Sequence, residues 1–294
     1  MANEDSVTTV KERIVKGEGT WVLEREFGTE GESKMNWAYG ICVSPNQDIV
    51  VTQNHHNESK VSVFDSEGKF KKVLHGADLE WANGVAVNSE GNYFVVDGEG
   101  TPYVKVYGPD GEFMREFPAK SHQGKWSNAD GRCRLLSVTI DHEGYVWIGA
   151  TKRYISKHTQ DGTHVASFKT TKPPAFMTIT TKGRIIFSPE DGLQGAQVLD
   201  HTGNRLCVIN APPGLENFRP MGLCSVDDDV FFVCSWSDDD DGGVFCYTVE
   251  GEYVGCVTRS VIEAFGITFT KDYKLLVAEF RGHPVKVFSN IPAS

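Results

Sequence analysis

The chain has 294 residues, and its 29 Lys and Arg against 40 Asp and Glu give a formal net charge of −11. This acidic balance disfavours nucleic-acid partners, because phosphate backbones are bound by clustered Lys and Arg. No window is long and apolar enough to cross a bilayer, and the opening residues lack the apolar run of a signal peptide. We therefore expect a soluble, cytoplasmic protein that does not bind membranes.

The first 19 residues fit no strand pattern, and we expect them to be a linker or disordered leader. Such a leader suggests that the chain is one domain of a longer protein. The segment that follows, residues 21–27, has the alternating pattern of an outer strand.

A unit of four short strands then recurs along the chain. In the clearest copy, strands are expected at 83–87, 93–97, 103–107 and 113–117, with turn residues between them. Equivalent positions fall at 40, 84, 137, 176, 222 and 266, which are 44, 53, 39, 46 and 44 residues apart. This period is typical of the blades of a β-propeller.

The sixth copy ends after three strands, at 266–269, 275–278 and 285–288. The strand expected at 21–27 can complete it, which would close the ring and protect the sheet edges. The sequence therefore predicts an all-β, six-bladed propeller that is closed by its N-terminal strand, as a single domain over residues 20–294.

Residues 26–31, 39–43 and 61–70 resemble the repeats of NHL propellers, especially those that end tripartite-motif ubiquitin ligases. The resemblance spans roughly residues 21–289. It implies a protein-binding module, such as the substrate-recruiting domain of a ligase whose catalytic parts lie outside this chain. The aspartate that commonly ends the second strand in that family is kept as Asp97. At the matching end of the second strand in other blades, we expect Thr52, Ser188, Ser235 and Glu279 instead of aspartate.

In an antiparallel blade, the loops between blades and those between second and third strands emerge on one face, where propellers usually bind. The residues expected around the channel mouth on this face are mostly apolar and aromatic. They either pack between blades or form exposed binding anchors. The predicted partner-binding residues are Trp37, Tyr39, Trp81, Asn83, Arg134, Phe218, Arg219 and Phe265.

The loops of this face also carry many acidic residues, which favour a protein or peptide partner of basic character and disfavour RNA, the third alternative. They are Asp97, Glu99, Glu190, Asp191, Asp238, Asp239, Asp240, Asp241 and Glu279. The run of four aspartates fits either a solvated turn or a weak calcium site.

The sequence contains no GxSxG elbow, phosphate-binding glycine loop or HExxH helix. Of the residues at the mouth, Asn83 alone suits a hard cation. We therefore expect no enzymatic activity and no cofactor. The alternative is a metal-dependent hydrolase or lyase, for which His55, His56 and His283 are the candidate metal ligands. The seven cysteines are expected to be reduced packing residues.

Overall fold

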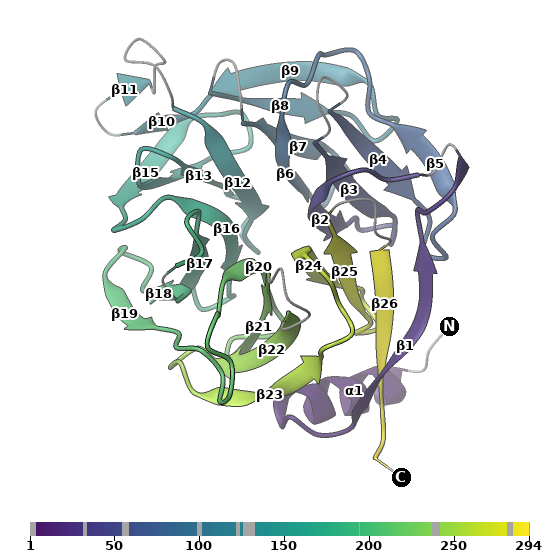
Figure 1. Ribbon diagram of the computed structural model, residues 1–294. Coiled ribbons are helices and arrows are strands. Elements are labelled where there is room, and N and C mark those ends of the chain that lie inside the picture. The colour runs from purple at the N-terminus through teal and green to yellow at the C-terminus, as the bar shows by residue number, and fades with distance from the viewer. Residues whose placement is uncertain are drawn as a thin grey trace.

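The computed structural model describes residues 4–31, 34–54, 59–98, 102–121, 124–125, 133–193, 195–236, 242–280 and 285–293. In these segments the strands form six four-stranded antiparallel sheets, which stand radially around a central axis (Figure 1). The prediction of an all-β, six-bladed propeller is confirmed.

Five blades are built from consecutive strands. Blade 1 contains β2 (Ala38–Val43), β3 (Ile49–Gln53), β4 (Lys60–Phe64) and β5 (Phe70–Val73). Blade 2 contains β6 (Ala82–Val87), β7 (Tyr93–Asp97), β8 (Tyr103–Tyr107) and β9 (Phe113–Pro118). Blade 3 contains β12 (Leu135–Ile140), β13 (Val146–Ala150), β14 (Tyr154–His158) and β15 (His164–Lys169). Blade 4 contains β16 (Pro174–Ile179), β17 (Ile185–Pro189), β18 (Gln197–Leu199) and β19 (Arg205–Val208). Blade 5 contains β20 (Pro220–Ser225), β21 (Val230–Ser235), β22 (Gly243–Thr248) and β23 (Tyr253–Thr258). A small two-stranded sheet, β10 (Lys120–Ser121) with β11 (Gly124–Lys125), follows blade 2.

The sixth blade joins the two ends of the chain. It contains β24 (Ala264–Phe269), β25 (Leu275–Glu279), β26 (Val285–Ile291) and the N-terminal strand β1 (Thr20–Phe27) as its outer strand. In this pairing Val22 lies opposite Ser289, in antiparallel register. The predicted closure is therefore confirmed, and it leaves no unpaired edge on β26.

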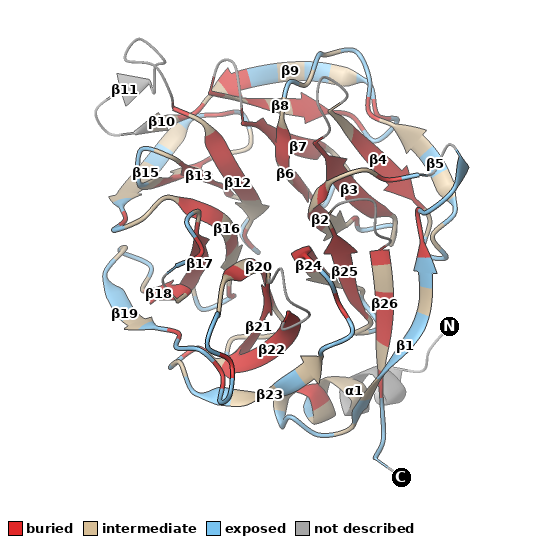
Figure 2. Ribbon diagram, viewed as in Figure 1, coloured by how far each residue is buried: buried red, intermediate tan, exposed pale blue. Residues whose placement is uncertain are grey.

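Burial falls from the inner strands toward the outer ones. Every residue of the second strand of each blade is buried, whereas outer strands such as β19 and β23 contain only exposed and half-buried residues (Figure 2). The second strand carries apolar side chains on both faces because each face meets a neighbouring blade. The apolar clusters accordingly lie between adjacent blades, as where Val96 of blade 2 meets Ile148 of blade 3.

The leader is not a linker throughout. Glu4–Val15 forms helix α1, and its Ile14 is 2% exposed in a cluster with apolar residues of blades 5 and 6. Arg13 fixes the helix further by donating two hydrogen bonds to Asn290, on β26. The apolar residues of this helix are few and recur at helical spacing, so a strand pattern does not reveal it. No helix in the described segments is long and apolar enough to cross a membrane.

Strand register corrects part of the sequence comparison between blades. Asp97 lies opposite Ala82 where the inner strand begins, and Glu279 lies opposite Ala264 in the same way. The matching residue of blade 1 is Gln53 rather than Thr52, and that of blade 4 is Pro189 rather than Ser188. A shift of one residue moves a side chain to the other face of the strand, so Thr52 and Ser188 have another role.

Candidate functional site: the channel mouth

One hydrogen bond recurs six times and defines the rim of the channel mouth. The residue after each second strand donates its backbone N–H to the carbonyl of the residue just before the inner strand. The six donor and acceptor pairs are Asn54 and Trp37, Gly98 and Trp81, Thr151 and Arg134, Glu190 and Pro173, Trp236 and Arg219, and Phe280 and Glu263. Four predicted binding residues, Trp37, Trp81, Arg134 and Arg219, thus occupy equivalent rim positions.

Aromatic rings from three blades meet across the axis just inside this rim. The ring of Tyr39, in blade 1, stacks on Phe176 of blade 4 with their centroids 5.0 Å apart. It also lies 5.2 Å from the ring of Phe265, which stacks on Phe280 at 4.5 Å, and Phe280 in turn lies 5.3 Å from Trp37. Blades 1 and 4 stand opposite each other in a ring of six, so these five side chains form an aromatic plug over the channel.

Three of the predicted aromatic residues pack within the plug. Phe265 is 9% exposed and Tyr39 and Trp37 are half-buried, so all three pack between blades. Burial, with a smaller contribution from the negative charge of Glu190, raises the pKa of the Tyr39 hydroxyl above its ordinary value. The Tyr39 hydroxyl therefore stays protonated near neutral pH and cannot act as a general base there.

A cavity of about 60 Å³ lies beneath the plug, among the inner strands. Gly40, Gly84, Gly222 and Gly266 line it, and a Cβ atom on Gly222 would lie 2.2 Å from the carbonyl oxygen of Phe265. A glycine is therefore needed at position 222 so that the inner strands of blades 5 and 6 can approach each other. The cavity has room for a few water molecules but lies far below the roughly 300–1,000 Å³ of small-molecule sites.

Two arginines flank the loop that follows β17 in blade 4. Arg134 Nη2 lies 2.5 Å from Glu190 Oε1, and its side chain is still 42% exposed. The guanidinium of Arg219 lies 4.8 Å from the centre of the Trp236 ring, at cation–π distance. Glu190 and Trp236 were not predicted to contact these two arginines, although each directly follows the second strand of its blade.

Two predicted residues do not present their side chains for binding. Phe218 packs against Phe245 and Tyr247 inside blade 5, with ring centroids 6.2 and 6.3 Å away. Asn83 is 3% exposed; its amide donates to the carbonyl of Leu135 and accepts a hydrogen bond from Asn54. These hydrogen bonds join neighbouring blades, so the side chain of Asn83 does not point into the mouth, where it could bind a cation.

Several acidic residues in the described part of the mouth form ion pairs with basic side chains. Asp97 Oδ2 lies 3.0 Å from Lys105 Nζ, and Glu279 Oε1 lies 2.9 Å from Lys286 Nζ, in matching positions of blades 2 and 6. Lys172 pairs with Asp191 in blade 4. Glu99 and the run Asp238, Asp239, Asp240 and Asp241 lie outside the described residues. Acidic charge in the described part of the mouth is therefore largely neutralised.

The candidate metal ligands His55, His56 and His283 also lie outside the described residues. Within the residues that are described, no group of three or more His, Cys, Asp and Glu side chains could hold a metal ion. Cys224, Cys234 and Cys246 are buried free thiols, and Cys256 is exposed.

No family model matches the chain. It is similar to Protein brain tumor of Drosophila melanogaster, with 28% identity over 127 residues, which are 41% of this chain and 11% of that protein. The chain thus spans about a tenth of the length of the curated relative it matches. A putative gluconolactonase has a similar structure, with a TM-score of 0.69, 14% identity and 95% of both chains covered. Virginiamycin B lyase from Staphylococcus aureus follows, with a TM-score of 0.61, 15% identity, and 92% of this chain and 100% of that chain covered. At such low identity these two structures show that this chain shares the six-bladed propeller fold.

Proposed function

We propose that the chain is a protein- or peptide-binding propeller of the NHL kind, which presents its channel mouth to a partner as the substrate-recruiting domain of a ubiquitin ligase. The observation that carries the proposal is the aromatic plug. The plug closes the channel over a cavity of only about 60 Å³, which is too small for a typical small-molecule substrate and supports a partner that binds across the surface of the mouth. The NHL-like repeats and the similarity to Protein brain tumor support the same reading.

Three rim side chains suit the contact with the partner. Trp81, Arg134 and Arg219 are half-buried at equivalent positions, and Trp and Arg are the residue types that most often dominate binding energy. Trp37 shares this rim position, but its ring packs on Phe280 in the plug, and Tyr39 and Phe265 also support the surface by packing. Substitutions at the rim therefore test binding with less risk to the fold than substitutions in the plug.

The test compares captured partners for the wild type, Trp81→Ala, Arg219→Ala and the control Lys71→Ala. Lys71 is a suitable control because it lies on the outer strand β5 and makes an exposed ion pair with Asp48. A partner that binds the mouth should bind the Lys71→Ala control as tightly as the wild type. It should bind the rim variants about ten-fold or more weakly when affinities are measured with purified proteins. If every partner binds all four proteins equally, the mouth is not the binding surface.

A metal-dependent hydrolase or lyase is the second candidate, and whole-length fold similarity to lactonase- and lyase-type propellers favours it. Metal analysis of the purified protein, together with lactone hydrolysis assays, tests it. Stoichiometric zinc or calcium with turnover would replace the binding proposal. A salt-dependent RNA complex would instead support the RNA-binding alternative, against the net charge of −11.

A further inference from the structure

An apolar side chain stands out on the mouth face of blade 4. Among the large apolar side chains of the described residues, that of Leu193 is the most exposed, at 75%. It belongs to the loop after β17, which emerges at the mouth, whereas most of the other exposed ones lie on outer strands. A single exposed leucine is ordinary on a protein surface, so its surroundings decide whether it marks a contact.

The loop that carries Leu193 is held from two sides. Asp191 Oδ2 lies 2.7 Å from Lys172 Nζ, and its Oδ1 accepts the backbone N–H of Leu193 at 3.4 Å. On the side of blade 5, a Cβ atom on Gly192 would lie 3.4 Å from the Cβ atom of Arg219, so the loop backbone lies against this arginine. Leu193 is therefore exposed on a loop that is already positioned, which lowers the entropic cost of using it in a contact.

Arg219, beside this loop, carries a positive charge that no described carboxylate balances. Its guanidinium lies 4.8 Å from the centre of the Trp236 ring, and none of the ion pairs among the described residues includes it. The two carboxylates of the neighbouring loop pair with Arg134 and Lys172 instead. An acceptor for the Arg219 guanidinium can therefore come from a partner.

We propose that this sector of the mouth binds a partner segment in which a large apolar residue stands beside an Asp or Glu. The apolar side chain covers Leu193, and the carboxylate binds the guanidinium of Arg219. This inference rests on the proposed function, because it names the chemistry that the mouth recognises in a protein partner.

The two contacts fit the chemistry of the two side chains. A planar guanidinium can donate two parallel hydrogen bonds to one carboxylate, and an arginine stacked on a tryptophan is already oriented to do so. Leu193 gains from a contact only when apolar surface replaces the water around it. A nucleic acid fits this sector poorly, because phosphate backbones need several clustered cations rather than one beside a leucine.

A random heptapeptide phage library, selected on the folded full chain, tests the proposal. We expect enriched sequences to place Asp or Glu beside a large apolar residue. Leu193→Ser and Arg219→Gln should each weaken binding of the synthetic peptides about five-fold or more. Leu193→Ser carries little risk to the fold because the side chain is exposed.

Double-mutant cycles between protein and peptide show whether the contacts are direct. Replacing the peptide carboxylate by an amide should weaken binding to the wild type and have little further effect on Arg219→Gln. Replacing the apolar peptide residue by Ala should likewise have little further effect on Leu193→Ser. Such non-additivity marks groups that touch each other, so effects that simply add in both cycles overturn the proposal.

Leu206→Ser and Arg205→Gln are the matched controls and should leave the affinity unchanged, because both residues are exposed on β19, the outer strand of the same blade. Absence of enriched peptides, or enriched peptides without acidic residues, overturns the proposal. If Arg219→Gln lowers the melting temperature, Leu193→Ser decides instead. Peptides that bind Trp81→Ala weakly but Leu193→Ser and Arg219→Gln normally use another part of the mouth, which overturns this inference and supports the proposed function.

Discussion

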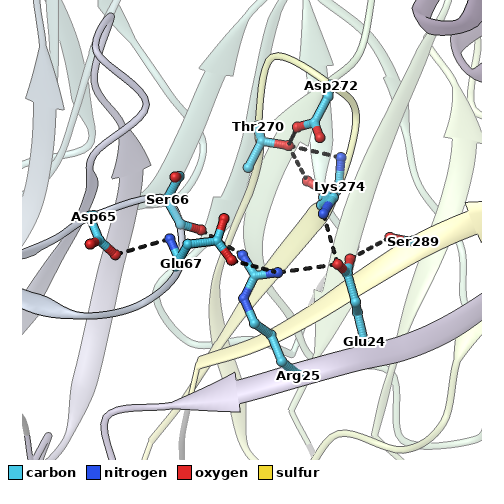
Figure 3. Close-up of polar contacts among 9 residues, drawn as sticks. All are labelled: Glu24, Arg25, Asp65, Ser66, Glu67, Thr270, Asp272, Lys274 and Ser289. Carbon is cyan, nitrogen blue, oxygen red and sulfur yellow. Dashed lines mark hydrogen bonds and ion pairs between the residues drawn. The ribbon is translucent and has the colours of Figure 1, made fainter. Parts of the chain in front are cut away.

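Glu24 Oε1 accepts a hydrogen bond of 2.8 Å from Lys274 Nζ, although 250 residues separate the two in sequence. Figure 3 shows this pair at the junction where the ring closes, with Arg25 beside it. Glu24 Oε2 also accepts from the hydroxyl of Ser289 on β26, and Arg25 donates to the carbonyl of Ser66 in blade 1. Two consecutive residues of β1 thus tie blade 6 to blade 1, at the bulge that shifts the register between Leu23 and Arg25.

The first prediction concerns the apolar side of this closure. Trp21 packs its ring against Phe232 of blade 5 and Phe269 of blade 6, each 6.2 Å away. Trp21→Ala should lower the free energy of unfolding by about 2–3 kcal/mol, less than for a fully buried tryptophan because Trp21 is half-buried. Val22→Ala is the control, since Val22 is 42% exposed and should cost about 0.5 kcal/mol or less. Urea unfolding measures both, and equal losses would contradict a closing role for Trp21.

The second prediction concerns the charge of Glu24. Burial raises the pKa of its carboxyl, but the hydrogen bonds from Lys274 and Ser289 outweigh burial and leave the pKa below its ordinary value of 4.5. A lowered folded-state pKa stabilises the protein above pH 4.5, and this stabilisation is lost as the pH falls through the folded-state value. The side chain is 37% exposed, so the gain should stay below about 1 kcal/mol. Glu24→Gln should therefore cost stability at pH 7 and little at pH 3 in urea unfolding, whereas an equal cost at both would contradict the prediction.

The third prediction separates buried from exposed ion pairs. Asp97 accepts the backbone N–H of Trp81 at 2.7 Å, and its partner Lys105 is 15% exposed. Asp97→Asn leaves a buried ammonium without its counter-charge, which should cost about 3–5 kcal/mol. Asp48→Asn removes the partner of the exposed Lys71 and should cost about 1 kcal/mol or less. Similar losses for the two variants in urea unfolding would show that Asp97 does not organise the rim.

The fold could be predicted because its signal is repeated and local. Each blade repeats the same alternation, several turns carry glycine, and positive φ at Gly91, Gly144 and Gly183 bears out three of those turns. The match between the strand at 21–27 and the incomplete sixth copy then predicted closure. Helix α1 was missed because a single helix has no repeat to support it.

The site could be predicted only in part, because its contacts depend on geometry between blades. The rim positions of Trp37 and Trp81 follow from the repeat. The stacking of Tyr39 on Phe176 requires knowing that blades 1 and 4 face each other across a channel narrow enough for two rings to meet. The bulge in each inner strand also moved the blade 1 match from Thr52 to Gln53, which side-chain pattern alone does not reveal.

The fourth prediction concerns a buried histidine. His158 is fully buried in blade 3, where its Nε2 lies 3.0 Å from the Ser156 hydroxyl, and burial lowers its pKa to about 4. The folded state therefore keeps the imidazole neutral, while the unfolded chain takes up a proton below about pH 6.5. Stability should fall as the pH drops from 6.5 to 4, by up to about 3 kcal/mol from this residue. His158→Gln should remove this part of the pH dependence, and the exposed His201→Gln should not.

The fifth prediction concerns thiol reactivity. Burial raises the pKa of Cys42, Cys234 and Cys246 to about 12 in each case, so their reactive thiolate form is scarce at neutral pH. Cys256 is the exposed free thiol among the described cysteines and should react first with a disulfide reagent such as DTNB. Cys256→Ser should abolish this fast phase, and the buried thiols of Cys234 and Cys246 should react only when denaturant opens the blades. Fast reaction of all thiols in the native protein would mean that blade 5 opens readily, because Cys234 donates to the carbonyl of Ala264 across its boundary with blade 6.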